Sequence, residues 1–408
     1  MESPALSRRL AWTVALVATL TMTVSYIDRA TLAVLAPSVT KALGISDTAY
    51  GWLTSAFSIA YLVATPLSGW WIDRVGARRG LLGSLLLWTS IAALHALVPG
   101  FATLFILRIA LGIAEGPSFP GAAQTLQRVL PPDERARGFG VLFTGSSIGG
   151  MLVPPLASWL FGLGGWPLAF VGTAAVGLLW VPLWLLVTRR ADVRARMDTP
   201  PAAEDVVPRA SFRDLASHPI LLRGLCAIFA AAPIAGFALG WGAKFLDRTF
   251  RVAQEDVGHY LWLPPLMFDA GAILFGDLAS RLRRAPGAPP RLLFAIAFIL
   301  GTALALLPLA TTPWQAMAFL GIAMIGAGAM YTLATADLLS RVPARNVSLA
   351  GGMMAGSQSL ALIIMNPLIG ASVDHAGDYH AVTIALGIWV IPGSLVWLAW
   401  RPPSYARA

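Results

Sequence analysis

Residues 68–80 read SGWWIDRVGARRG, and this short stretch decides the fold class. It places one aspartate and three arginines in a Gly-x-x-x-Asp-Arg-x-Gly-x-Arg-Arg frame, between apolar runs at 50–71 and 81–98. Each run is close to the roughly 20 residues that a helix needs to cross a bilayer core. We therefore predict two membrane-spanning helices joined by a tight polar loop. The residues of the frame are Gly69, Asp73, Arg74, Gly76, Arg78 and Arg79.

A loop that only sets the membrane orientation through its positive charge would explain the arginines. It would not explain the spacing of the glycines and the aspartate. We expect Gly69 to let neighbouring helices approach closely. We expect Asp73 and the arginines to pair with nearby helix ends and so to hold one helical bundle against the other. The frame is thus assigned a structural and gating role.

The composition of the whole chain supports a membrane protein. Of 408 residues, 57% are apolar and only 12% are charged, and the mean hydropathy is +0.71. A soluble chain carries about 25% charged residues. Too little polar surface remains to cover a water-soluble body, which excludes a soluble enzyme, a nucleic-acid binder and a disordered protein. The single cysteine, Cys226, excludes an intramolecular disulfide.

Apolar runs of spanning length recur along the chain. We predict an all-α integral membrane protein with twelve transmembrane helices in two six-helix bundles: an N-terminal bundle at 1–188, a cytoplasmic connecting loop at 189–218 and a C-terminal bundle at 219–408. The predicted spans are 11–38, 50–71, 81–98, 102–127, 138–162, 166–188, 219–246, 256–280, 290–310, 313–340, 347–372 and 379–400.

The net charge of +9 is distributed unevenly between the loops. One side of the predicted membrane protein carries almost all the arginines, whereas the other has only Lys41, Lys244, Arg248 and Arg251. Cytoplasmic loops hold an excess of basic residues. We therefore expect both termini and the 189–218 connection to be cytoplasmic, in a multi-pass protein of the bacterial inner membrane.

An internal repeat points to transport. Gly140 to Pro155-Leu156 and Gly352 to Pro367-Leu368 have the same spacing, about half the chain apart. Repeats packed around a midplane cavity are the usual plan of a secondary transporter.

The predicted helices also contain ionisable residues at membrane depth, which are functional candidates by default. Tyr26 and Arg29 share a helix face, while Asp28 points about 100° away from Arg29. Arg108 and Glu115 also share a face, roughly 10 Å apart along the axis. These four charges could simply neutralise one another and lock the helices. Apolar packing is often as stable as buried charge, so we favour a functional role.

The 68–80 frame resembles the signature loop of the major facilitator superfamily, and the likeness in helix count and basic loops covers essentially the whole chain. The matching second-half loop, Gly276 to Arg284, has Ser280 where the frame expects aspartate. Three further motifs resemble the anion:cation symporter branch, which includes bacterial galactonate and hexuronate proton symporters. These three motifs are Tyr26-Ile-Asp28-Arg29, Arg108-(x)6-Glu115-Gly116 and Gly145-Ser-Ser-Ile-Gly149. A fourth motif that resembles the same branch is Asp337-(x)5-Pro343.

This resemblance implies roles for particular residues. It implies that Asp28 and Glu115 couple protons, with Arg108 as their partner. It implies that Arg29, Tyr26 and Tyr61 meet an anionic substrate. When the anion binds Arg29, an acid that was paired with it loses its counter-charge and favours protonation.

The second half is expected to complete the substrate site. Lys244 is a second carboxylate anchor or a lysine that reaches the outer headgroups. Asp269 is expected to orient backbone or to pair with Lys244. The remaining candidates are polar or aromatic and could read substrate hydroxyls or join helices. These candidates are Trp241, Tyr331, Thr335, Gln358, Ser359 and Asn366.

We find no metal-ligand spacing, catalytic constellation or nucleotide-binding motif in the sequence, so we expect no enzyme activity and no cofactor. The predicted function is import of an organic carboxylate, a sugar acid or another monocarboxylate, by proton symport with alternating access. The expected partners are the small anion, protons and the lipid bilayer, without nucleic acid, and the protein is expected to be a monomer. The alternatives are an organic anion or phosphate antiporter, a drug exporter of the same fold, and a non-transporting membrane receptor.

Overall fold

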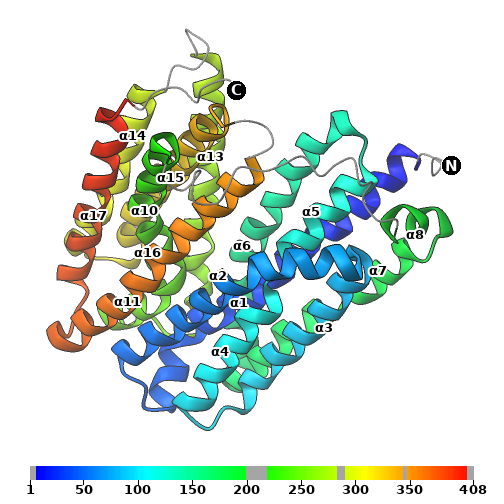
Figure 1. Ribbon diagram of the computed structural model, residues 1–408. Coiled ribbons are helices and arrows are strands. Elements are labelled where there is room, and N and C mark those ends of the chain that lie inside the picture. The colour runs from blue at the N-terminus through cyan, green and yellow to red at the C-terminus, as the bar shows by residue number, and fades with distance from the viewer. Residues whose placement is uncertain (1–5, 199–217, 283–289, 343–346, 402–408) are drawn as a thin grey trace. The chain divides into compact units, whose positions relative to one another are not determined.

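The computed structural model of the protein describes residues 6–198, 218–282, 290–342 and 347–401. Within these ranges the chain is helical and has no β-strand (Figure 1). The first half contains α1 (Arg8–Ala42), α2 (Asp47–Val75), α3 (Ala77–Leu94), η1 (His95–Leu97), α4 (Phe101–Glu115), α5 (Ser118–Val129), α6 (Pro132–Leu178), α7 (Trp180–Thr188) and α8 (Ala191–Asp198). The second half contains α10 (Pro219–Gly240), α11 (Gly242–Phe250), α12 (Gly258–Leu261), α13 (Leu263–Arg281), α14 (Arg291–Gly301), η3 (Thr302–Leu309), α15 (Pro313–Leu339), α16 (Val347–Ala376) and α17 (His380–Ala399).

The predicted membrane-spanning fold is confirmed. In the described part of the chain, ten helical segments are long and apolar enough to cross a membrane. One of them, Pro132–Thr188, contains a break with non-helical backbone at Gly164 and Gly165, and so covers two predicted spans. α2 is not among the ten, but its 29 residues cover the predicted span at 50–71. All twelve predicted spans therefore fall on helical segments.

The described residues form two compact units. Unit 1 contains the residues up to Ile45, those from Ala56 to the end of α8, and Ala253–Trp262. Unit 2 contains Ser46–Ser55, the residues from His218 to Val252, and those from Leu263 onward. The division at 189–218 stays a prediction, but two segments do not follow the order of the chain: Ser46–Ser55 and Ala253–Trp262 each belong to the unit formed mostly by the other half.

The beginning of the predicted connecting loop is a short helix. α8 buries Val193 and Met197 completely in the core of unit 1. Arg196 Nε donates to the Arg128 carbonyl at 2.8 Å, and Arg128 Nη1 donates back to the Met197 carbonyl. Residues 199–217 of the predicted loop lie outside the described residues.

The loop frame at 68–80 ties four helices of unit 1 together: α2, α3, α5 and α7. Gln124 of α5 donates through Nε2 to Asp73 Oδ1 at 2.7 Å, and its Oε1 accepts from the Ala77 backbone N–H at 3.1 Å. The Arg78 carbonyl accepts from Trp184 Nε1 at 3.0 Å. Arg74 lies over the ring of Trp70, and Arg79 is exposed. Asp73 therefore holds the beginning of α3 through a glutamine.

The two glycines of this frame differ in their surroundings. Gly76 has φ of 84°, in the left-handed region that disfavours any side chain. Gly69 is inside α2, and a Cβ added there would meet no atom within 4 Å. The close helix approach expected at Gly69 is therefore not seen.

The second-half motifs have their own partners in unit 2. Asp337 is buried and pairs with Arg223 of α10 and, at 2.9 Å, with Arg341. In the last turns of α13, Asp277 pairs with Arg281 at 2.7 Å. Ser280, three residues after Asp277, donates its hydroxyl to the Asp277 carbonyl. Arg283, Arg284 and Pro343 lie outside the described residues.

The backbone at these two glycines yields a stability prediction. Gly76→Ala forces a side chain into left-handed backbone and should lower the free energy of unfolding by about 1–2 kcal/mol. Gly69→Ala is the matched control, because it replaces glycine in a helix where space is open, and should leave stability unchanged or raise it slightly. Denaturant unfolding of the purified protein in detergent measures both. Equal destabilisation by the two substitutions would contradict this account.

Candidate functional site

The charged cluster predicted in the first half forms a single site in unit 1. α1 contributes Ser25, Tyr26 and Arg29, α2 contributes Phe57 and Tyr61, and α4 contributes Arg108 and Glu115. The sequence identified these residues except Ser25 and Phe57. Each of the two stands four residues before a predicted member, Ser25 before Arg29 and Phe57 before Tyr61, so helical spacing is the signal that could have found them.

Glycines bring the backbones of these helices together. A Cβ at Gly149 of α6 would lie 2.5 Å from the Thr23 carbonyl and 2.8 Å from Tyr26 Cβ. A Cβ at Gly112 of α4 would lie 2.7 Å from the Phe57 carbonyl. Thr23 Oγ1 donates to the Gly145 carbonyl at 3.0 Å, across the same α1–α6 contact. The Gly145–Gly149 motif thus places the α1 face that carries Tyr26 and Arg29.

Glu115 is the centre of the site. Its side chain is fully buried, and one oxygen, Oε2, accepts three hydrogen bonds. They come from Ser25 Oγ at 2.8 Å, Arg29 Nε at 3.1 Å and Arg29 Nη2 at 2.9 Å. The other oxygen, Oε1, is buried and makes no hydrogen bond with any residue that the structure describes. The two oxygens of one carboxylate therefore have very different surroundings.

Arg29 lies in an aromatic cage. Its guanidinium carbon is 4.8 Å from the ring centroid of Tyr26, 4.8 Å from that of Phe57 and 4.6 Å from that of Tyr61. Such rings attract a guanidinium through their electron-rich faces. The side chain is 21% exposed, and its Nη1 has no hydrogen-bond partner within the described ranges. Glu115 occupies the Nε–Nη2 edge of the guanidinium, and Nη2 also donates to Ser25 Oγ at 3.4 Å, so that Nη1 is the nitrogen left open.

The two tyrosines of the cage are half-buried. Neither phenol hydroxyl hydrogen-bonds to a residue in the described part of the chain, although both rings are fixed against Arg29. The two phenol hydroxyls and Nη1 of Arg29 are therefore available together for a ligand.

Arg108 approaches the same site from α4. It is 4% exposed, donates from Nη1 to the Arg29 carbonyl at 3.3 Å, and lies 4.7 Å from the Phe57 ring centroid. Phe57 thus contacts both guanidinium groups. The structure thus places Arg29, Arg108 and Glu115 together, with Arg29 as the direct ion-pair partner of Glu115.

Asp28 points away from this pair, as its place on α1 predicts. It is 2% exposed, and Oδ2 is 3.4 Å from Thr89 Oγ1 of α3. Oδ1 is buried without a hydrogen-bond partner, and no described cation forms an ion pair with Asp28. A bare carboxylate in such a place costs several kcal/mol. Asp28 is therefore a buried acid without a counter-charge.

The candidates from the second half lie in unit 2. Trp241 is fully buried and donates from Nε1 to Asn366 Oδ1 at 3.0 Å. Lys244 is buried and pairs with Asp47 Oδ1 at 2.9 Å. Tyr331 packs edge-on to Phe268. The half-buried candidates of α15 and α16 are Thr335, Gln358 and Ser359. A substrate-binding role for these residues stays a prediction.

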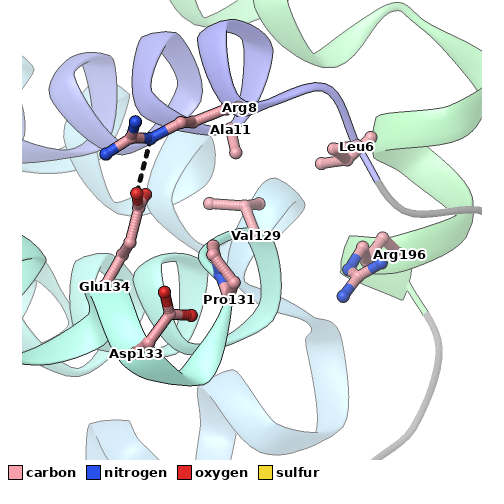
Figure 2. Close-up of a pocket in the computed structure, with 8 residues that line it drawn as sticks. All are labelled: Leu6, Arg8, Ala11, Val129, Pro131, Asp133, Glu134 and Arg196. Carbon is pink, nitrogen blue, oxygen red and sulfur yellow. Dashed lines mark ion pairs between the residues drawn. The ribbon is translucent and has the colours of Figure 1, made fainter.

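A separate pocket of about 450 Å³ lies at the N-terminal end of α1 (Figure 2). Figure 2 shows Arg8 reaching across it to Glu134, with 2.5 Å between Nε and Oε1, while Arg196 of α8 stands on another side. From Arg8 to Arg29 the helix rises roughly 30 Å. This pocket is thus distinct from the Arg29 site. Among the described residues no three His, Cys, Asp or Glu side chains are placed to hold a metal ion.

Comparison with known proteins identifies the family. Residues 18–352 match the model of the Major Facilitator Superfamily. The hexuronate transporter of Escherichia coli K12 is 27% identical over 406 residues, which cover 95% of this chain and 93% of that protein. The galacturonate transporter of Dickeya chrysanthemi is 27% identical, covering 65% of this chain and 81% of that one. The D-galactonate transporter of Escherichia coli O6:H1 is 24% identical, covering 86% of each chain.

A solved structure shares the fold. It is a bacterial homolog of the human lysosomal transporter Spinster, in an inward-facing and unoccupied conformation. The TM-score is 0.80 at 19% sequence identity, with 96% of this chain and 97% of that chain covered. The helices, the signature loop and the family match agree with one another. The chain belongs to the major facilitator superfamily, whose members are membrane transporters and not enzymes.

Proposed function

We propose that the protein imports an organic carboxylate, a sugar acid or another monocarboxylate, together with protons by alternating access. The observation that carries this proposal is that the Arg29 guanidinium pairs with Glu115 through only one of its edges. Glu115 takes its Nε–Nη2 edge. On the other edge, within the aromatic cage, Nη1 is open and Nη2 makes one long hydrogen bond, 3.4 Å to Ser25 Oγ, which a ligand could replace. The names of the relatives, transporters of hexuronate, galacturonate and galactonate, support the same substrate class.

The open edge suits a planar anion. A carboxylate can accept two parallel N–H bonds from one edge of a guanidinium, which is stronger and more directional than pairing with a point charge. The free hydroxyls of Tyr26 and Tyr61 would bond the carboxylate or the hydroxyl group next to it. Substrate and Glu115 would then occupy the two edges of Arg29 at the same time.

Proton coupling follows from this sharing. With the substrate carboxylate bound, the two arginines of the site, Arg29 and Arg108, face three carboxylates, those of Glu115, Asp28 and the substrate. The site then has a net charge of −1, and one bound proton removes it. Glu115 Oε1 is the atom for this proton, since its occupation disturbs none of the three hydrogen bonds to Oε2. This modifies the simpler expectation that the substrate displaces the acid from Arg29. Asp28, buried without a cation, is the second acid in the proposal.

We propose in addition that the protein works as a monomer in the bacterial inner membrane, with both termini cytoplasmic. The charge asymmetry of the loops supports this orientation. The proton gradient across that membrane would supply the energy, without a cofactor.

Uptake into liposomes tests the function. With glucuronate, galacturonate or galactonate outside, an inward proton gradient should drive accumulation above the external concentration, and an uncoupler should abolish it. Equilibration that is independent of pH would replace symport with facilitated diffusion. Flux only with substrate inside would establish an antiporter, and binding without flux would establish a receptor.

Arg29→Lys tests the guanidinium edge. Lysine keeps the charge but loses the planar pair of donors, so substrate affinity should fall at least about tenfold. Arg9→Lys, at an exposed position near the beginning of α1, is the matched control and should bind normally. Ligand-induced thermal shifts give the affinities. Unchanged affinity in Arg29→Lys would refute two-point binding of the carboxylate.

Glu115→Gln separates binding from coupling. Glutamine has the shape of the acid and keeps an oxygen for Ser25 and Arg29, but it cannot exchange a proton. Substrate exchange across the membrane should persist, while gradient-driven accumulation should disappear. Glu255→Gln, on an exposed loop, should retain accumulation. Accumulation by Glu115→Gln against a concentration gradient would remove Glu115 from the coupling mechanism.

A further inference from the structure

His95 is a buried titratable residue of unit 1 that the transport mechanism above does not use. It stands at the beginning of η1, directly after α3, and is 1% exposed. Its Nδ1 lies 2.8 Å from the Ile91 carbonyl. A carbonyl oxygen can only accept a hydrogen bond, so we assign the proton of the neutral ring to Nδ1 and a free lone pair to Nε2. Nε2 is buried and makes no hydrogen bond with any described residue. His95 therefore presents a proton acceptor inside unit 1.

The surroundings of this ring include one charge. Phe170 of α6 lies against the ring, with 5.3 Å between the two centroids. Arg108 of α4 stands close enough for its charge to act on His95, and no other described charged side chain does so. A second positive charge beside an arginine is unfavourable. A proton that reaches Nε2 would therefore be passed on and not kept, which suits a relay.

A buried acid lies farther along α3. Trp88 precedes His95 by seven residues, which is two helical turns on the same face and roughly 10 Å along the axis. Its indole N–H faces the Asp28 carboxylate without a hydrogen bond of normal geometry. Thr89, the next residue, has its Oγ1 at 3.4 Å from Asp28 Oδ2. One side of α3 thus extends from the carboxylate of Asp28 to the imidazole of His95.

Three buried polar atoms along this side have no hydrogen-bond partner among the described residues: Nε2 of His95, Nε1 of Trp88 and Oδ1 of Asp28. Buried polar groups are almost always hydrogen-bonded, and those without a protein partner commonly bond to buried water. We therefore expect water molecules between these three atoms. A lone pair, an N–H group and a carboxylate oxygen linked by water form a path along which a proton can move.

The two ends of this path differ in depth. α3 begins at the loop frame, whose arginines predict the cytoplasmic side, so η1 is expected at the opposite, outward end of the span. η1 ends at Leu97, and residues 98–100 connect it to α4. His95 is thus within one turn of the predicted outer loop. Asp28 lies deeper, on another face of α1 than Arg29.

We propose that His95 is a proton relay, which takes protons at the outward end of α3 and passes them through buried water to Asp28, on a path separate from the Arg29 cage. A proton from water binds Nε2 and makes the ring an imidazolium. Nε2 then releases this proton to the buried water, and Oδ1 of Asp28 receives one from it. Nδ1 keeps its bond to the Ile91 carbonyl throughout, so the ring need not turn. The proposal rests on the proposed function, in which Asp28 is the second acid.

Infrared spectroscopy after a rapid drop in pH tests the relay without any substrate. A protonated carboxyl gives a C=O band, and the band that is missing in Asp28→Asn belongs to Asp28. His95→Asn keeps an N–H donor for the Ile91 carbonyl but cannot bind and release a proton. In this variant the Asp28 band should reach the same final height as in the parent protein, but at least about tenfold more slowly.

His259→Asn is the matched control, because His259 belongs to unit 1 and its side chain is 73% exposed. It should leave the rate unchanged. Equal rates in His95→Asn and the parent protein, or no band that belongs to Asp28, would overturn the relay.

His95→Phe separates the relay from a purely structural role. Phenylalanine fills a similar space but offers no donor to the Ile91 carbonyl. If His95 only satisfied that carbonyl, His95→Asn would protonate Asp28 at the normal rate and only His95→Phe would be impaired. The relay predicts slow protonation in both variants, although His95→Asn keeps the midpoint of denaturant unfolding of the parent protein.

Uptake into liposomes, with galacturonate or galactonate as the probe, separates failure of the relay from failure of the proposed function. Substrate exchange at equal pH needs no net proton movement, so His95→Asn should exchange at the rate of the parent protein. Its proton-driven uptake should fall at least about tenfold. Full proton-driven uptake by His95→Asn would overturn the relay. A parent protein that neither accumulates nor exchanges the probe would count against the proposed function alone, and the infrared measurement would still decide on the relay.

Discussion

The ion pair between Arg29 and Glu115 is the interaction on which the site depends. A fully buried carboxylate is costly unless it is paired and hydrogen-bonded. Here one of its oxygens receives all three donors and the other receives none. This asymmetry leaves Oε1 of Glu115 open to a proton, and Nη1 of Arg29 is open to an anion. In this account the substrate binds to Arg29 and the proton binds to Glu115, the two members of one ion pair.

The rest of unit 1 fixes this pair in position. Gly149 allows α6 to meet α1 beside Tyr26, and Gly112 allows α4 to meet α2 beside Phe57. Three aromatic rings then surround Arg29 and limit the directions from which a ligand can reach it. α2 supplies two of these rings, Phe57 and Tyr61.

Much of this arrangement could be predicted from the sequence, because membrane burial makes each polar residue conspicuous. Spans, loops and the charged residues of α1 and α4 follow from hydropathy and helical periodicity. Helical spacing puts Phe57 on the same face as Tyr61, but only the fold places that ring against Arg29. Lys244 posed the opposite problem: its charge was evident, but its partner Asp47 lies almost two hundred residues away in the chain. Periodicity predicts which residues share a face of one helix, but it does not predict which other helix packs against that face.

The central claim is that a carboxylate on the open edge of Arg29 brings a proton to Glu115. Proton uptake on substrate binding, measured with a pH indicator on the purified protein in weakly buffered detergent, tests it most directly. We predict that substrate addition makes the solution more alkaline in the parent protein, and that this signal is lost in Glu115→Gln although the substrate still binds. Binding by the parent protein without proton uptake, or equal uptake by both proteins, would contradict the account.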